Sequence, residues 1–351
     1  DSDFSDILLD QCDEIHFLHA NYHKREHLWK HKDKWENIFV HAYLPDMLKY
    51  GDSVKQFNTN VDTEAVDDLM KYCKKRIWIG LTDSQLFTDY PNNTITIPNF
   101  YEFKNNFLLE KLTDSLLVAI NDGGNEPLIY VLDFTGKIIA KKAVTNTTNI
   151  DWEALAIDQK YVYIGDFGNN LNERKDLCIY RISRNSILNE EPLIAEKMTI
   201  HYREQTQFPP EQASRYFDAE AMTFFEGQLW IFTKNSTKPF DGISYIYTVQ
   251  FESNQSKTLS KTAELKLNKT SYLKDAITSA CTVGTTIVLT TYNRMIELSF
   301  PKQGLTKSNL FFYPHIQQVE ACVSIGQDTY FISNEKNKFL GPAKFTKLHL
   351  P

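Results

Sequence analysis

The chain has 351 residues, of which 42% are hydrophobic and 24% are charged, and this composition excludes an intrinsically disordered protein. Its formal net charge of −7 and pI near 5.8 argue against a general nucleic-acid-binding or anionic-membrane-binding surface. No apolar run reaches the roughly 18 residues of a membrane helix, so we expect no membrane span.

The N-terminal part of the chain has a helical pattern. Residues 14–50 are charged and rich in histidine, with apolar residues at roughly helical spacing. Residues 62–76 read as a second amphipathic helix, with acids in the first turns and bases in the last. We predict a mainly helical region over residues 1–90 and a second domain over 91–351.

The second domain is built from a recurring unit. A strongly apolar strand that ends in a polar residue occurs five times, at 116–122, 161–166, 229–234, 286–292 and 329–335. Most of these strands lead into an outer strand, at 128–133, 177–182, 245–249 and 295–300. A repeated four-stranded unit of roughly 40–50 residues is typical of a β-propeller blade. The sequence therefore predicts an all-β, five-bladed β-propeller; the alternative is a sixth blade made from 76–105 and 344–350.

Acidic residues recur at one phase of the repeat. Glu153, Glu220 and Glu320 each stand thirteen or fourteen residues before the polar end of the next strand, and Thr278 takes this place in the fourth unit. Equivalent positions on the innermost strands converge at one end of the central channel of a propeller. Three carboxylates there would repel one another, and a calcium ion is the natural compensation for an all-oxygen set. We predict an axial calcium site; the alternative is that each acid caps a strand or pairs with a base.

Polar residues at the strand ends are candidates for binding a small-molecule or protein ligand at the mouth of this channel. They are Asp122, Asp166, Asn169, Asn170 and Lys234. We interpret the glycine-rich segments 121–125 and 165–170 as strand-terminating turns that need positive φ, with a phosphate-binding role as the alternative.

Sequons and cysteines bear on the compartment. N-x-[ST] sequons predict glycosylation in a secreted protein, with chance occurrence as the alternative, at Asn92, Asn146, Asn235, Asn254 and Asn268. The numbering begins at Asp1 without a Met, which we take as a mature or trimmed N-terminus, and secretion implies a signal. Disulfide pairing of Cys12 with Cys73 and of Cys281 with Cys322 would leave Cys178 free.

Four segments carry a resemblance to a known family. The chain resembles a largely uncharacterised family of secreted β-propellers in four segments. These are NDGGNEPLIYVLDFTGKI, DWEALAIDQKYVYIGDFGNN with the R and IYRI that follow it, DAEAMTFFEGQLWIFTK, and QVEACV with ISNE. The likeness covers about residues 105–335. A looser likeness is to the calcium-activated nucleotidases, five-bladed propellers with one axial calcium. That likeness implies Glu153, Glu220 and Glu320 as positions facing the ion, with Thr278 or Ser279 at the corresponding place in the fourth unit.

These observations favour a secreted, calcium-binding propeller glycoprotein that acts as a ligand- or partner-binding module. The alternative is a calcium-dependent hydrolase of phosphoanhydride or ester bonds, with Asp166 or Asp122 as the base. In a third, purely structural reading, the acids serve only to close the blades. The sequence does not decide whether the protein is an enzyme.

Overall fold

The computed structural model describes residues 94–96, 107–189, 191–267, 271–300, 305–313, 318–326, 328–334 and 344–350. Residues 1–90, with the helical pattern expected there and the Cys12–Cys73 pair, lie outside this part of the chain. Two of the sequons, at Asn92 and Asn268, also lie outside it.

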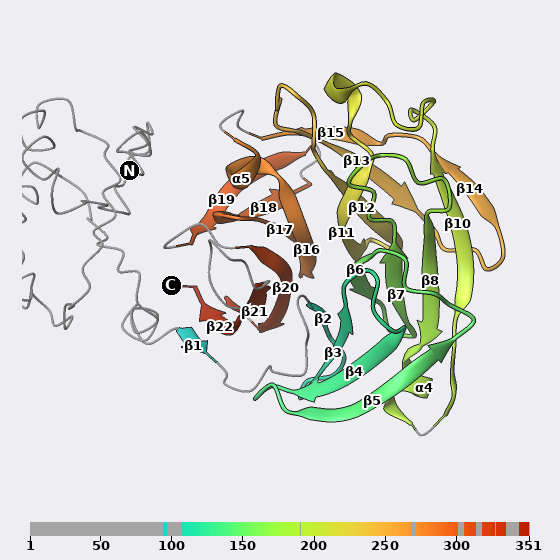
Figure 1. Ribbon diagram of the computed structural model, residues 1–351. Coiled ribbons are helices and arrows are strands. Elements are labelled where there is room, and N and C mark those ends of the chain that lie inside the picture. Colours follow the sequence, from blue (N-terminus) through green and yellow to red (C-terminus); the bar gives the residue numbers. More distant parts are fainter. Residues whose placement is uncertain are drawn as a thin grey trace, which may run out of the picture. The chain divides into compact units, whose positions relative to one another are not determined.

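Short strands form five sheets, each of four or five strands, and the sheets are arranged around a common centre (Figure 1). The first blade contains β2 (Phe107–Lys111), β3 (Leu116–Asn121), β4 (Leu128–Asp133) and β5 (Ile138–Thr145). The second contains β6 (Trp152–Ile157), β7 (Tyr161–Asp166), β8 (Cys178–Ser183) and β10 (Glu196–Tyr202). The third contains β11 (Asp218–Phe225), β12 (Gln228–Lys234), β13 (Ile243–Val249) and β15 (Ala263–Lys266). The fourth contains β16 (Ile277–Val283), β17 (Thr286–Thr291), β18 (Arg294–Ser299) and β19 (Thr306–Phe312). The fifth contains β20 (Val319–Gly326), β21 (Thr329–Asn334), β22 (Lys344–His349) and β1 (Thr94–Thr96).

The first strand of each blade is the innermost one. Contacts run from β2 to β6, then to β11, β16 and β20, and from β20 back to β2, so these strands line a closed ring. They all begin at the same end of the ring, because every blade repeats the same antiparallel order. We call this end the channel mouth.

The core lies between the blades. Each of the five gaps between neighbouring blades is filled by its own cluster of buried apolar side chains. Trp152 is fully buried between the first and second blades, and Phe331 is fully buried between the fifth and first. Both faces of every sheet are therefore covered by neighbours, which explains why the strands read as nearly continuous apolar runs.

The five-bladed architecture predicted from the repeat is confirmed, and the six-bladed alternative is wrong. The C-terminal strand β22 is the third strand of the fifth blade, and β1 adds to its outer edge. Of the segments proposed for a sixth blade, the described strands β22 and β1 thus complete the fifth, which would otherwise have only the two strands β20 and β21.

In two places a blade adds a short outer strand to the sheet of the preceding blade. β9 (Leu193–Ile194) follows the helix α4 (Arg184–Leu188) of the second blade and pairs in parallel with β5 of the first. In the same way β14 (Ser256–Leu259), from a loop of the third blade, pairs in parallel with β10 of the second. A second short helix, α5 (Tyr272–Asp275), precedes the fourth blade. Among the described residues, no helix has the length and apolar character needed to cross a membrane.

Candidate functional site

Four of the five innermost strands contain one extra residue near their start. The pairing of each innermost strand with its neighbour skips one position, and these positions are Glu153, Glu220, Thr278 and Glu320. Such a β-bulge turns the side chain of the extra residue in a new direction. The four residues predicted as calcium ligands therefore hold equivalent positions in four blades. The first blade has no such bulge, since β2 and β3 pair in unbroken register.

A lysine already occupies part of this ring of acids. The ammonium of Lys234, at the end of β12, lies 2.8 Å from a carboxylate oxygen of Glu220. It also lies 5.8 Å and 5.5 Å from the ring centroids of Tyr272 and Tyr292. Burial alone would lower the pKa of Lys234, but the charge of Glu220 raises it well above its usual range. Lys234 thus brings a permanent positive charge among the acids.

The other bulged residues also lie within the fold. Glu320 is buried, with 3% of its surface exposed, and the Thr278 hydroxyl lies 3.0 Å from that of Thr290. Of the four predicted ligands, the structure brings only Glu153 into a group of acids whose oxygens meet, as far as the described residues show.

That group consists of Asp122, Asp151 and Glu153, which we call the acidic cluster. One carboxylate oxygen of each lies within 4.8 Å of the others. Asp122 follows β3 in the first blade, whereas Asp151 and Glu153 flank Trp152 at the start of β6. The cluster thus joins two blades at the channel mouth. Asp151 was missed as a site residue from the sequence. In the sequence it stands one residue before the strand and two before Glu153, as the first residue of the DWEALAIDQKYVYIGDFGNN segment.

Two carboxylates of the cluster are unsatisfied. Within the described chain, neither the Asp151 nor the Glu153 carboxylate accepts a hydrogen bond or forms an ion pair, although Glu153 is only 7% exposed. Burial, followed by repulsion from Asp122, raises the pKa of Asp151 to about 6. Burial and the charges of Glu220, Asp122 and Asp151 raise the pKa of Glu153 well above its usual range. Bringing these acids together is unfavourable unless a proton or a cation neutralises them.

Two glycines make room for the Asp151 carboxylate. A Cβ on Gly123 would lie 2.3 Å from one of its oxygens, and a Cβ on Gly168 would lie 2.5 Å from the other. The Gly168 Cβ would also lie 2.6 Å from Cγ of Glu153. Any side chain at either position would displace the Asp151 carboxylate. Glycine at these two positions therefore lets the backbone pack closely against this carboxylate.

This finding changes the interpretation of the two glycine-rich segments. Gly124 has φ of +74°, as expected for a turn in 121–125. In the segment 165–170, however, neither glycine has positive φ, so the expectation of a left-handed turn there is wrong. Gly165 instead leaves space for the ring of Phe167, and Gly168 leaves space for the acidic cluster. Close packing therefore explains why glycine occurs at both Gly165 and Gly168.

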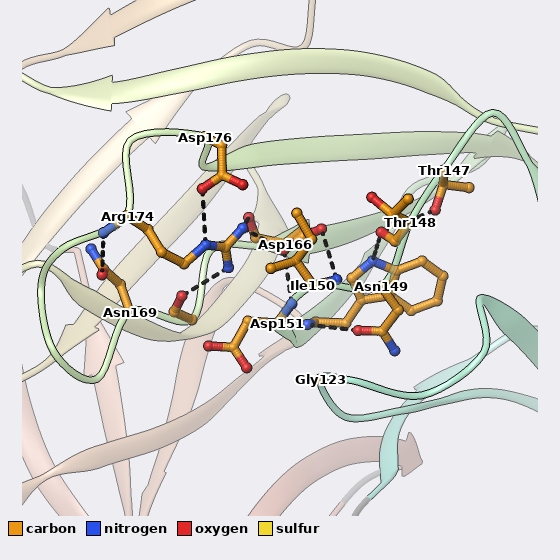
Figure 2. A network of polar contacts seen from close by, with 12 residues as sticks. Gly123, Thr147, Thr148, Asn149, Ile150, Asp151, Asp166, Asn169, Arg174 and Asp176 are labelled. Atoms are coloured by element: carbon orange, nitrogen blue, oxygen red, sulfur yellow. Dashed lines mark hydrogen bonds and ion pairs between the residues drawn. The ribbon is translucent and has the colours of Figure 1, made fainter.

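A network of polar contacts lies behind the acidic cluster (Figure 2). Asp166 is fully buried, and its Oδ1 accepts from the Asp151 backbone N–H at 3.0 Å and from the guanidinium of Arg174 at 2.8 Å. The same guanidinium donates to the Gly168 carbonyl at 2.9 Å and to Asp176 at 3.1 Å. The Asp151 carboxylate extends away from this pair (Figure 2). The network therefore holds the backbone and leaves the cluster's oxygens outside it.

The predicted ligand-binding residues separate into buried and accessible ones. Asp166 and Asn169 are buried; the Asn169 backbone N–H donates to Asp218 at 2.7 Å, and its amide donates to the Phe217 carbonyl at 3.2 Å. Asn170 is exposed. The contacts of Asn169 tie the loop after β7 to the third blade, whereas Asp166 contacts Ile150, Asp151 and Arg174 of its own blade.

The sequons and cysteines within the described part also have definite positions. Asn146 and Asn254 are exposed in turns. Asn235 is 2% exposed and its amide donates to the Ile243 carbonyl at 2.7 Å, which leaves no room for a glycan in the folded protein. Cys178 is a buried free thiol, as expected. The predicted disulfide between Cys281 and Cys322 is not formed: the sulfurs lie 3.3 Å apart as free thiols, beyond the bond length of about 2.05 Å.

No protein-family model matches the chain, and no curated protein matches it significantly. Solved structures similar to it include the WD40 repeats of RRP9, at 8% identity over 74% of this chain and 98% of that one, with a TM-score of 0.40. Streptogramin B lyase is similar at 9% identity over 74% and 97% of the two chains, with a TM-score of 0.34. Glutaminyl cyclase from Myxococcus xanthus is similar at 10% identity over 70% and 95%, with a TM-score of 0.36. These likenesses carry no argument about ligand or activity.

Proposed function

We propose that the protein is a calcium-binding propeller that holds a ligand or partner at its channel mouth, and that Asp122, Asp151 and Glu153 bind the ion. The observation that carries this proposal is the pair of unsatisfied carboxylates, Asp151 and Glu153, that face Asp122 with oxygens within 4.8 Å. Oxygens bound to one calcium at about 2.3–2.6 Å lie at most about 5 Å apart, so the spacing suits this ion.

The proposed position differs from the axial site expected from the repeat. Glu153 is common to both, but Glu220 is neutralised by Lys234. Because a lysine ammonium already provides positive charge on the Glu220 side, we place the ion on the side of the first and second blades. Three carboxylates leave part of the six to eight oxygen positions of calcium open, and ligand groups or water would complete the shell there.

The binding function is better supported than the hydrolase alternative. One of the two candidate bases, Asp166, is fully buried and ion-paired with Arg174, so it is unsuited to accepting a proton from a substrate or water. The other, Asp122, belongs to the acidic cluster itself. We therefore expect calcium to hold the mouth in shape for binding, without turnover of nucleotides or aryl esters.

Calcium binding is tested by thermal unfolding with calcium or with EDTA. Calcium at a hundred times its dissociation constant should stabilise the wild-type protein by about 2.7 kcal/mol, which is several degrees in Tm. Asp151→Asn and Glu153→Gln should lose this gain. Glu196→Gln, which removes a carboxylate paired with Arg181 in the same blade, should keep it.

The calcium-free protein provides a second, opposite readout. The folded-state pKa of Asp151, about 6, is above its ordinary value, so the folded state binds the extra proton and stability falls as pH rises from about 4 to 6. Asp151→Asn should therefore be more stable than the wild type at pH 7 in EDTA, by about 1 kcal/mol after solvent screening.

A wild-type Tm that calcium leaves unchanged would rule out the proposed ion site.

A further inference from the structure

We propose that Arg174 is a positioning residue for the calcium site, and that it sets the distance between the Asp151 and Glu153 carboxylates by fixing the backbone on both sides of Asp151 and the position of Gly168, which packs on both side chains. This inference rests on the proposed function, because it names the residue that shapes the same site. Arg174 touches none of the cluster's carboxylate oxygens and acts through other groups.

The first connection runs through Asp166. The Arg174 guanidinium donates to Oδ1 of Asp166 at 2.8 Å, and the same oxygen accepts from the backbone N–H of Asp151 at 3.0 Å. The other oxygen of Asp166 accepts from the N–H of Ile150 at 3.4 Å. The carboxylate of Asp166 thus holds the two residues that lead into β6, and Arg174 holds the carboxylate.

The second connection runs through Gly168. Another nitrogen of the guanidinium donates to the Gly168 carbonyl at 2.9 Å, and the N–H of Gly168 donates to the Asp151 carbonyl at 3.2 Å. Gly168 packs so closely on Asp151 and Glu153 that even a Cβ there would collide with both side chains. A shift of this glycine would therefore move the cluster's oxygens relative to one another.

The planar guanidinium is suited to this arrangement. It serves Asp166, Gly168 and Asp176 with separate N–H groups at the same time, as Figure 2 shows for the side-chain contacts. A lysine ammonium carries the same charge but lacks the fixed fork of donors. Substitution by lysine therefore removes geometry and keeps charge, whereas methionine removes both.

For the Arg174→Met variant, a role of Arg174 through charge and a role through geometry predict opposite changes in calcium affinity. If Arg174 affected the ion only as a nearby like charge, Arg174→Met would bind calcium more tightly. If Arg174 positions the cluster, both Arg174→Lys and Arg174→Met should bind calcium more weakly, by roughly 10- to 100-fold, as is typical when a group behind a metal ligand is lost.

The matched control is Arg181→Lys. Arg181 lies in the same blade, forms a 2.6 Å ion pair with Glu196 and stacks on Tyr161 and Phe251. Its substitution should lower Tm while leaving calcium affinity unchanged. This control separates a positioning role from a general loss of stability.

The experiment measures the calcium dissociation constant by calorimetry, well below each variant's Tm, together with the luminescence lifetime of Tb³⁺ bound in place of calcium and excited through Trp152. In Arg174→Lys we expect weaker calcium binding and additional water on Tb³⁺, because the carboxylates no longer converge. Unchanged affinity and hydration in Arg174→Lys, or tighter binding in Arg174→Met, would overturn this inference alone. A wild-type protein that binds neither ion would overturn both the inference and the proposed function.

Discussion

Glu110 is a buried acid outside the proposed ion site. It lies on β2 with 6% of its surface exposed, and among the described residues its carboxylate accepts only the N–H of the adjacent Lys111, at 3.2 Å. Burial raises its pKa to about 8. The carboxyl group is therefore neutral in the folded protein at neutral pH, whereas it is ionised in the unfolded chain.

This difference makes the contribution of Glu110 to stability depend on pH. Because the folded state retains the proton, stability falls as pH rises from about 4.5 to 8 and is then constant for this group. Glu110→Gln should therefore raise the free energy of unfolding at pH 8 by about 1–3 kcal/mol and change it little at pH 4. Urea unfolding at the two pH values measures this. An equal effect at both would show that Glu110 is ionised in the fold.

The bulged residues at equivalent positions of different blades differ in their ion pairing. Glu153 and Glu220 are equivalent by register, yet Glu220 is paired with Lys234 and Glu153 is unpaired within the described chain. Their difference arises from the residue at the end of the adjacent strand, which is Lys234 in the third blade and Asp166 in the second. Residue type and phase predicted where the acids stand but not which of them meet.

At the scale of the element, the loop after β7 positions the acidic residues of the proposed site. Its inward residues, Asn169, Asn172 and Arg174, are anchored by hydrogen bonds, while Leu171 remains 60% exposed. Gly168, the second residue of this loop, packs on the acidic cluster and does not have positive φ. The loop is thus held by hydrogen bonds and packs directly against the acidic cluster.

Gly168→Ala tests the role of this packing. The added methyl group would lie within 2.6 Å of Asp151 and Glu153, so we expect a loss of about 1–3 kcal/mol in stability and at least a tenfold loss in calcium affinity. Gly326→Ala is the matched control, because its Cβ would meet nothing within 4 Å. Equal behaviour of the two variants in unfolding and calcium titration would contradict the close packing inferred here.

At the scale of the whole molecule, five apolar clusters between blades hold the ring, and β1 and β22 complete its fifth blade. Secretion and glycosylation are proposals at this scale. Two of the described sequons, at Asn146 and Asn254, are exposed, so the fold leaves both accessible for attachment of a glycan.

The glycan prediction can be tested in a secreting eukaryotic host. The wild-type protein should lose apparent mass on glycosidase treatment, and the shift should become smaller in a variant with both Asn146→Gln and Asn254→Gln. Asn235→Gln should leave the shift unchanged and lower stability instead, because the Asn235 side chain is buried and hydrogen-bonded. A shift that depends on Asn235 would contradict its burial.

The repeat itself determined the architecture. Strands such as 161–166 and 229–234 could be read from the chain because a blade is a local unit, with apolar runs and turns only a few residues apart. The same periodicity placed Glu153, Glu220, Thr278 and Glu320 at equivalent positions. It also left five and six blades open, since completion of the last blade depends on a pairing between β1 and β22 across most of the chain.

Only the tertiary structure decided how the polar residues combine. Asp122 and Asp151 come from different blades, so their meeting does not follow from spacing along the chain. Lys234 and Glu220 lie on adjacent strands fourteen residues apart, but the spacing did not show that their side chains form an ion pair. Arg174, Asp166 and Gly168 are close in sequence, but their joint effect on Asp151 requires the loop to fold back on the start of β6. Local periodicity specifies blades, whereas a site at the channel mouth depends on the distances between them.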